Sequence, residues 1–268
     1  MQLNFKSLGQ GPPLVMLHGL FGSLDNWLGV ATNLAQHFQL FLLDLRNHGA
    51  SPHNPEMNYP ALAADLAEFF DAQKLEAANL LGHSLGGKVA MQFAFHFPAR
   101  VEKLIVVDVD PRAYPHEHDT IFAALLALDL RKFQSRKDVE DALAPAIPDL
   151  ALRRFLLKNL RYASGSALAA SKPGEDGFEW RIPLHAIFEN YPKLCRALIA
   201  KEPFTRPALF IRGGQSPYIN DADFPLIHQF FPGAKIETIP RAGHWLHADA
   251  PDEFVSLVSE FLNDSNRR

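Results

Sequence analysis

An apolar stretch at residues 78–81 runs directly into Gly82-His-Ser-Leu-Gly86, and a helical pattern begins near Lys88. A serine on so sharp a strand-to-helix turn has a strained backbone, and its hydroxyl is exposed at the end of a sheet. The two glycines are required because a Cβ at either position would collide with the opposite limb of the turn. The N-terminus of the helix favours negative charge near the hydroxyl. The pattern therefore predicts a nucleophile at Ser84 rather than an ordinary tight turn.

Short, continuous apolar runs alternate with helical patterns along most of the chain. The runs are too apolar for strands with a solvated face, which is typical of strands buried inside a parallel sheet. Between them, apolar residues recur at helical spacing, as in the stripe Leu62, Leu66 and Phe69. The predicted strands are residues 3–8, 14–17, 40–43, 78–82, 104–109, 208–212 and 235–239. This alternation predicts an α/β fold with a mostly parallel, twisted sheet and helices on both faces.

The alternation stops at residue 112 and resumes at residue 183. The intervening segment has helical patterns but no apolar strand of the core type. Its predicted pieces are helices near residues 119–128 and 149–160, a loop at 164–177 and a short extended piece at 177–182. We expect a helical cap, residues 112–182, inserted into a core formed by residues 1–111 and 183–268. The core is expected to resume with a helix over residues 184–201, interrupted at Pro192.

Charge and apolar content argue against several classes of protein. The net charge is −4, from 26 Lys plus Arg and 30 Asp plus Glu, and the absence of a basic stripe argues against a nucleic-acid partner. The N-terminus lacks the features of a signal peptide, and no apolar run approaches the roughly 20 residues that span a bilayer. The single cysteine, Cys195, has no partner for an internal disulfide, which is consistent with a cytoplasmic location. We expect a monomer or a small homo-oligomer.

The sequence contains no convincing metal site. His116-Glu-His118 is the closest approach to one, but it lacks the three or four convergent ligands that a metal needs. We interpret it as a turn at the surface. No metal or other cofactor is expected.

Polar residues follow the predicted strands at the carboxyl ends, where ligands bind in an open parallel sheet. These positions include His18-Gly19, Ser84, Asp108, Ser216 and His244. A serine hydroxyl is a weak nucleophile until a base takes its proton, and the base needs an acid to fix its tautomer. His244 follows the last strand, in a loop opened by a glycine, and is the predicted base. His247, three residues later, is interpreted as a packing or surface residue.

The chain resembles the α/β-hydrolases, and over nearly its whole length it resembles the small bacterial serine esterases of the YbfF-like type. Several of the matching motifs are specific to those esterases, and the predicted cap is the least diagnostic stretch. The matching motifs are His18-Gly-Leu-Phe-Gly-Ser23 with Asp25-Asn26, Asp44-Leu-Arg-Asn-His-Gly49, Met57-Asn-Tyr-Pro60, Gly82-His-Ser-Leu-Gly-Gly-Lys88, Val107-Asp108, Gly213-Gly-Gln-Ser-Pro-Tyr218 and Gly243-His-Trp245.

The resemblance bears on the identity of the acid. Most α/β-hydrolases carry an aspartate after the strand that corresponds to residues 208–212, but here that loop reads Gly213-Gly-Gln-Ser216. The related esterases imply that Asp108 orients the histidine and that Ser216 adds a hydrogen bond nearby. Asp110 is the alternative, and Asp108 is preferred because it matches the family position. Asp221 and Asp223 are expected to be loop and helix-capping residues.

The same architecture predicts where the oxyanion is bound. One donor is the backbone N–H of Leu85, the residue after the nucleophile. The second comes from the loop after His18-Gly19, with Leu20 preferred and Phe21 as the alternative. The side chains of Phe21, Trp180, Tyr218 and Trp245 are expected to line an apolar acyl pocket, although Trp180 is equally well explained as a core residue.

These residues predict a serine hydrolase that cleaves carboxylic esters or acyl thioesters through an acyl-enzyme on Ser84. The resemblance implies short- to medium-chain acyl groups, with acyl-CoA thioesters among the candidate substrates. A carbon–carbon bond hydrolase with the same triad and a hydrolase-fold receptor without turnover are the alternatives. An epoxide hydrolase or a dehalogenase is disfavoured, because either would need an aspartate at position 84.

Overall fold

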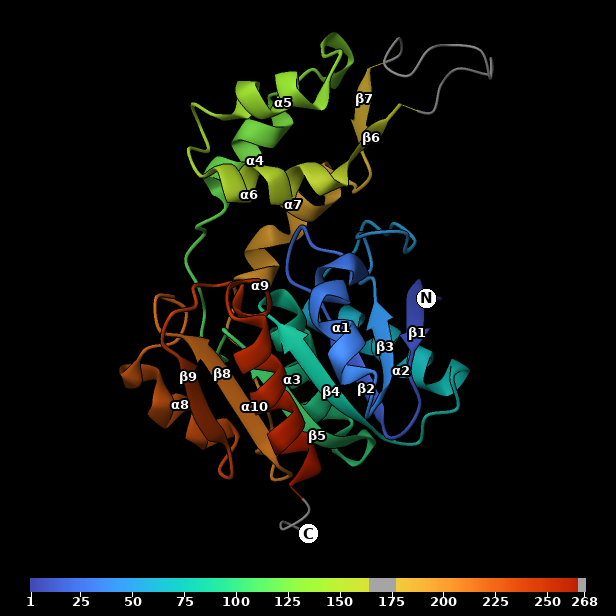
Figure 1. The fold of residues 1–268 in the computed structure, drawn as a ribbon, viewed down its shortest axis with the longest axis vertical. Coiled ribbons are helices and arrows are strands. Elements are labelled where there is room, and N and C mark those ends of the chain that lie inside the picture. The colour runs from blue at the N-terminus through green and yellow to red at the C-terminus, as the bar shows by residue number, and fades with distance from the viewer. Residues whose placement is uncertain (164–176, 265–268) are drawn as a thin grey trace.

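The computed structural model describes residues 1–163 and 177–264, so the predicted loop at 164–177 and the predicted tail at 263–268 lie largely outside the described residues. The described chain contains a seven-stranded sheet in the order β1-β3-β2-β4-β5-β8-β9. Only β1 is antiparallel to its neighbour, so the predicted mostly parallel α/β sheet is confirmed (Figure 1). The strands are β1 (Phe5–Leu8), β2 (Pro13–Leu17), β3 (Gln39–Leu43), β4 (Ala78–His83), β5 (Val101–Val107), β8 (Ala208–Gly213) and β9 (Lys235–Ile239).

Helices cover both faces of this sheet, because alternate side chains of each buried strand point to opposite faces. Leu14 and Met16 of β2 belong to the core on the face covered by α1 and α10, whereas Val15 and Leu17 belong to the core on the other face. Figure 1 shows α1 and α10 in front of the sheet and α2 and α3 behind it. The helices of the sheet layer are α1 (Leu28–Leu34), α2 (Tyr59–Ala72), α3 (Leu85–His96), α8 (Phe224–Phe230), α9 (Leu246–Asp249) and α10 (Pro251–Asn263).

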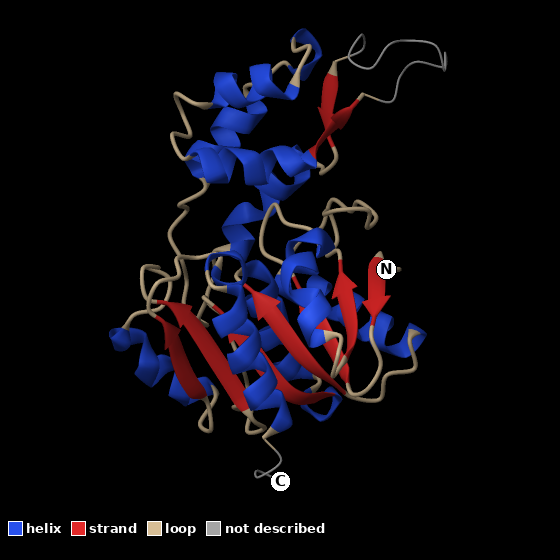
Figure 2. Cartoon of the chain, viewed as in Figure 1, coloured by secondary structure: helices blue, strands red, loops and turns tan. Residues whose placement is uncertain are grey.

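The described helices and strands between β5 and β8 lie beyond the carboxyl ends of the parallel strands and are mostly helical (Figure 2). Strands β6 and β7 form a separate antiparallel pair, and β7 falls where the sequence predicts a short extended piece. The elements are α4 (Asp119–Leu126), η3 (Leu130–Lys132), α5 (Arg136–Leu143), α6 (Leu150–Leu156), η4 (Leu157–Asn159), β6 (Leu160–Tyr162), β7 (Phe178–Trp180) and α7 (Leu184–Leu194).

Two helix predictions in this part of the chain are too long. The helix predicted over residues 149–160 ends at Leu156, and Leu160 instead pairs with Trp180 in the small sheet. The helix predicted over 184–201 tolerates Pro192 but ends at Leu194. Beyond that point, residues 195–198 run beside residues 111–114, with Tyr114 N–H donating to the Cys195 carbonyl and Leu198 N–H to the Pro111 carbonyl. Long-range backbone pairing replaces the helix there.

Among the described residues, no helix has the length and apolar character required to cross a bilayer.

The loop after β3 is anchored by a buried ion pair. The guanidinium of Arg46 donates from Nε and Nη2 to the two carboxylate oxygens of Asp65 on α2, at 2.6 and 2.8 Å. The remaining donors of Arg46 bind the carbonyls of Glu56 and Ala61. Both charged side chains are almost fully buried, so neither charge has an alternative partner in water.

We predict that Asp65→Ala lowers the free energy of unfolding by about 3–5 kcal/mol, because it leaves the buried Arg46 charge uncompensated. Urea denaturation monitored by circular dichroism measures the change. The matched control is Asp71→Ala on the same helix, where the carboxylate is 71% exposed and pairs with Arg100 at 2.7 Å. This surface pair is worth about 0–1 kcal/mol, so equal losses in the two variants would contradict the prediction.

Candidate active site

Ser84 lies in the sharp turn between β4 and α3. Its backbone has φ 53° and ψ −118°, a conformation that non-glycine residues rarely adopt. A Cβ on Gly82 would lie 2.2 Å from the Gly86 carbonyl oxygen across the turn, as predicted. A Cβ on Gly86 would instead lie 2.4 Å from the carbonyl oxygen of Leu17 on the neighbouring β2, and not against the opposite limb of the turn. The strain predicted from the Gly-x-Ser-x-Gly pattern is therefore present, and only glycine fits at the two flanking positions.

Asp108 and His244 form a direct pair next to this turn. The Nδ1–H of His244 donates to Oδ2 of Asp108 at 2.7 Å. The Ser216 hydroxyl donates to the same oxygen, and the N–H of Gly213 donates to Oδ1 at 3.0 Å. Asp108 is fully buried and has a positive φ of 52°. These three donors make Asp108 an acceptor at both of its oxygens, which orients the His244 ring.

Asp110, the alternative acid, is engaged elsewhere. Its Oδ1 accepts the N–H of Arg112 at 2.8 Å, and its Oδ2 accepts Nε of Arg112 at 3.2 Å. Burial raises the pKa of Asp110, and the contacts with Arg112 oppose that rise. The structure therefore places Asp108, and not Asp110, on the ring of His244.

Ser84 and His244 line the same pocket, which brings together the three residues of the predicted triad. In the part of the chain that the structure describes, no hydrogen bond yet joins the Ser84 hydroxyl to the His244 ring. Hydrogen bonds of this kind are often long or misaligned before substrate binds. Ser84 and His244 thus share one cavity, and the His244 ring is already oriented by Asp108.

His83, between Gly82 and the nucleophile, has a role that the sequence analysis did not identify. Its Nε2–H donates to the backbone carbonyl of His244 at 2.8 Å, so the residue before the nucleophile fixes the loop that carries the base. Burial lowers the pKa of His83 well below 6.5, with nearby His244 and His247 adding to the effect. The histidine is visible in the motif around Ser84, but its position at the end of a buried strand does not show which backbone group its ring binds.

The loop after β2 lies against the nucleophile, as an oxyanion site requires. A Cβ on Gly19 would lie 3.3 Å from Cβ of Ser84 and 3.1 Å from Nδ1 of His83. Within the described residues, the N–H of Leu20 has no hydrogen-bond partner. Leu85 is the first residue of α3, where a backbone N–H has no acceptor within the helix.

Phe21, the alternative oxyanion donor, is excluded by its own hydrogen bond. Its N–H donates to Nε2 of His48 at 3.2 Å, and the Nδ1–H of His48 donates to the Arg46 carbonyl. His18 has the same tautomer. Its Nδ1–H donates to the Gly19 carbonyl, and its Nε2 accepts the N–H of Leu45. Burial lowers the pKa of His18 to about 4 and that of His48 to about 3. Both rings are therefore neutral supports of the loop.

Two pockets meet at Ser84. Each has an empty volume of about 470 Å³, and Ser84, Leu20 and His118 line both of them. The first is further lined by Tyr59, Leu85, Lys88, Val109, Tyr114, Pro115, Glu117, Tyr191, Leu194, Cys195 and Tyr218. The second is further lined by Gly19, Phe21, Asn26, His83, Ile121, Leu152, Phe155, His244, Trp245 and His247.

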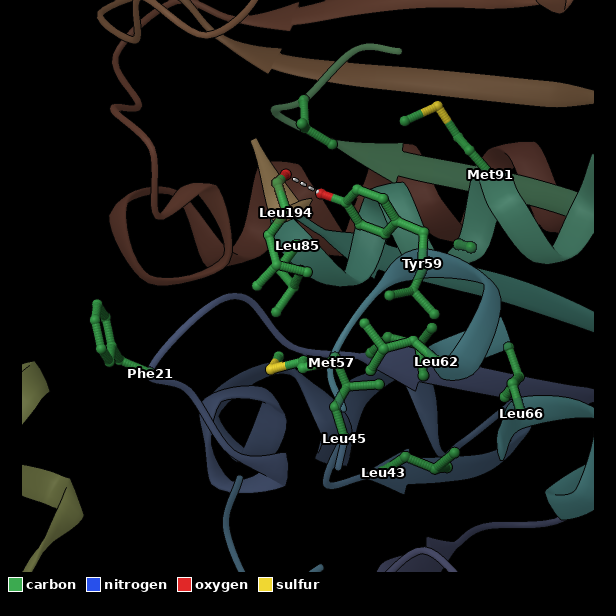
Figure 3. Close-up of a cluster of buried hydrophobic side chains, with 14 of the residues drawn as sticks. Phe21, Leu43, Leu45, Met57, Tyr59, Leu62, Leu66, Leu85, Met91 and Leu194 are labelled. Atoms are coloured by element: carbon green, nitrogen blue, oxygen red, sulfur yellow. Dashed lines mark hydrogen bonds between the residues drawn. The ribbon is translucent and has the colours of Figure 1, made fainter. Parts of the chain in front are cut away.

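The floor of the first pocket is a packed apolar cluster. Figure 3 shows Leu85 beside Tyr59 and Leu194, with Met57 below them. The hydroxyl of Tyr59 donates to the Leu194 carbonyl, so it presents its ring and not its polar atom to the cavity. Hydroxyls satisfied in this way leave a largely apolar lining.

Three of the four predicted lining residues are at the pockets. Phe21 and Trp245 line the second pocket, and Tyr218 lines the first, where its ring also stacks on His244. Trp180 lines neither of them: it lies on β7 and packs against the core, as its alternative interpretation expected.

His116-Glu-His118 forms a turn with His116 and Glu117 exposed, as predicted, but His118 itself lies at the pockets. The His118 ring lines both pockets, and its Nδ1 is 2.8 Å from the Tyr191 hydroxyl. Burial lowers its pKa to about 4, with His244 contributing. His247 is likewise buried, 4.8 Å from the Trp27 ring, and its predicted packing role agrees with the structure. In residues 1–163 and 177–264, no group of three or more His, Cys, Asp or Glu is arranged to hold a metal ion.

Comparisons with known proteins agree with this architecture. A model of the alpha/beta hydrolase fold family matches residues 12–251. Esterase YbfF of Escherichia coli is 37% identical over 254 residues, which are 94% of this chain and 93% of that protein. The sn-1-specific diacylglycerol lipase ABHD11 of Xenopus tropicalis is 35% identical over 263 residues, which are 95% of this chain and 79% of the frog protein.

The solved structure of a marine microorganism esterase superimposes with a TM-score of 0.91 at 41% identity, covering 97% of this chain and 99% of that one. The resemblance predicted from the motifs is thereby confirmed. The chain belongs to the α/β-hydrolase fold family and lies close to its small serine esterases.

Proposed function

We propose that this protein is a carboxylic ester hydrolase that acts through an acyl-enzyme on Ser84. Its relatives are named as esterases and lipases, which supports an esterase- or lipase-like serine hydrolase. The single observation that carries the proposal is the 2.7 Å hydrogen bond from His244 to buried Asp108, in a pocket shared with the strained Ser84. A serine, a histidine and an acid in this relation are the parts of an acyl-transfer mechanism.

In the proposed mechanism, His244 takes the hydroxyl proton of Ser84 as the oxygen attacks the ester carbonyl carbon. The oxyanion that forms is bound by the N–H groups of Leu20 and Leu85, and Asp108 stabilises the imidazolium. His244 then protonates the leaving alcohol or thiol as the bond to the acyl carbon breaks. Water, deprotonated by His244, then attacks the acyl carbon. As the second intermediate collapses, the bond from the acyl carbon to Oγ of Ser84 breaks, His244 returns the proton to Oγ, and the carboxylic acid leaves.

The resemblance to the small esterases suggests substrates with short- to medium-chain acyl groups. The mostly apolar lining of the first pocket is what such groups need. One pocket then takes the acyl chain, and the other takes the alcohol or thiol, because Ser84 lies where they meet. Thioesters, including acyl-CoA, remain candidates because the same acyl-enzyme forms from them.

Two alternatives are decided by experiment. A carbon–carbon bond hydrolase uses the same fold and residues, since fold and triad do not determine the substrate. A receptor with this fold would retain the pocket and lack turnover. The strained conformation of Ser84 favours an enzyme over a receptor, because such strain persists where it serves chemistry.

We predict that a fluorophosphonate probe labels Ser84 and that Ser84→Ala abolishes the labelling. The probe reacts with a serine only when a base activates the hydroxyl. Mass spectrometry of the digested protein identifies the modified residue. Ser135 caps α5 and is partly exposed, and it lines neither pocket, so Ser135→Ala is the matched control that retains labelling. Absence of labelling in folded protein would support the receptor instead.

We predict that Asp108→Asn lowers kcat by on the order of 10⁴, because the amide favours the wrong tautomer of His244. The contrasting variant is Asp110→Asn, which changes a buried carboxylate two residues away that contacts Arg112 instead of the base. Steady-state kinetics with a p-nitrophenyl ester measures both, and circular dichroism verifies that both are folded. A larger loss in Asp110→Asn than in Asp108→Asn would refute the assignment.

We predict that p-nitrophenyl esters of short and medium acyl chains are hydrolysed and that diketo acids with a cleavable carbon–carbon bond are not. Acyl-CoAs and diacylglycerols complete the panel, since they test the thiol and glycerol leaving groups. The Ser84→Ala variant gives the background rate for every substrate. Turnover of the diketo acids alone would establish the carbon–carbon alternative.

A further inference from the structure

The ring of Tyr218 lies flat on the imidazole of the predicted base. The centroids of Tyr218 and His244 are 4.1 Å apart, with an angle of 21° between the ring planes. This is the tightest ring contact of His244, since His83 lies at 4.6 Å and 45°, and Trp245 at 6.3 Å and 58°. Tyr218 follows Ser216 in the loop after β8, so the same loop provides a hydrogen bond to Asp108 and a face for His244.

A second set of contacts holds Tyr218 from behind. Its carbonyl accepts the hydroxyl of Tyr114 at 2.9 Å and Nη2 of Arg112 at 3.2 Å. Arg112 is fixed in turn by Asp110, and it lies 4.1 Å from the Tyr114 ring. The buried pair that Asp110 forms with Arg112 thereby supports the loop behind the base.

The hydrogen bond to Asp108 alone does not fix the plane of the His244 ring. With the ring attached to the chain at Cγ, a single hydrogen bond at Nδ1 restrains rotation about χ2 but still allows the ring to rock about the N–H direction. The side chain of His244 is 21% exposed, so close packing does not enclose it completely. A flat contact on one face limits this rocking and thereby the direction of Nε2.

We propose that Tyr218 is a positioning residue that holds the His244 imidazole in the plane needed to reach Ser84. This inference rests on the proposed function, because it assigns His244 the role of base. The face of a tyrosine ring also attracts a cation, so the stack becomes more favourable when His244 carries the proton during the reaction. Tyr218 was expected only to line the acyl pocket, and this role is additional.

The other groups around His244 do not compete with this interaction. Asp108 is the one carboxylate in contact with the ring among the described residues. Three histidines lie nearby, and burial lowers the pKa of each, to about 4 for His118 and His247 and well below the usual value for His83. They are therefore neutral near pH 7 and place no charge beside the His244 ring.

We predict that Tyr218→Leu lowers kcat about 3- to 10-fold, with KM little changed, because an aromatic pair of this kind is worth roughly that factor. Leucine keeps the site apolar while removing the flat face. Tyr218→Phe retains the ring and should restore most of kcat. Tyr162→Leu, at a tyrosine that is 51% exposed on β6, controls for the substitution itself.

A proton NMR measurement tests the same inference without turnover. The Nδ1–H of His244 bonded to Asp108 should give a sharp downfield resonance, identified by its absence in His244→Gln. We expect the resonance to broaden in Tyr218→Leu and to remain sharp in Tyr218→Phe. If Ser84 proves unreactive, this signal still reports on the stack, so failure of the proposed function and failure of this inference are distinguishable.

A raised KM with unchanged kcat and a sharp resonance in Tyr218→Leu would overturn the inference and leave Tyr218 as a pocket residue only. If Tyr218→Leu does not fold, Tyr114→Phe replaces it, since that variant removes one hydrogen bond to the Tyr218 carbonyl and keeps every ring. We then expect a broadened resonance. A resonance as sharp as in the unaltered protein would refute the role of Tyr218.

Discussion

The carboxylate of Asp108 is the point at which three distant parts of the chain meet. It accepts the backbone N–H of Gly213, the hydroxyl of Ser216 and the ring N–H of His244. A buried carboxylate is costly unless such donors surround it, so the fold must bring them together. Strand register does this: Val107 of β5 lies beside Ile211 of β8, which places the ends of both strands at one edge of the sheet. The geometry of the base is therefore a consequence of parallel pairing.

Three neutral histidines hold the loops around this site. His18, His48 and His83 are buried, and each donates one ring N–H to a backbone carbonyl. Burial lowers their pKa values far enough that they stay uncharged near neutral pH. A neutral ring can donate on one side and accept on the other, which suits it to join two loops. The loop after β2 and the loop that carries His244 are held in this way without adding charge to the pocket.

The sequence predicts those features that follow from local patterns. Continuous apolar runs gave the strands, and the glycines around Ser84 gave the turn, because each depends on neighbours along the chain. The stack of Tyr218 on His244, the placing of His118 in the pocket and the bond from His83 were not predictable. Each of these contacts joins residues that are distant in the sequence and that come together only because of the order of the strands in the sheet. The identity of the acid was partly predictable. The residue pattern alone did not decide between Asp108 and Asp110, and only the matching position in the related esterases favoured Asp108.

Lys88 shows how the helix that starts at the nucleophile is tied to the predicted cap. Its ammonium donates to the carbonyls of Arg112 and Arg196, which lie in the two connections that lead to and from that segment. Burial lowers the pKa of Lys88 to about 8, yet two carbonyl acceptors and the ring of Tyr114 at 4.9 Å stabilise the charged form. Tyr114 and Arg112 also hold the Tyr218 carbonyl. A displacement of these two connections would thus disturb the ring that faces His244, so the cap and the base belong to one bonded network.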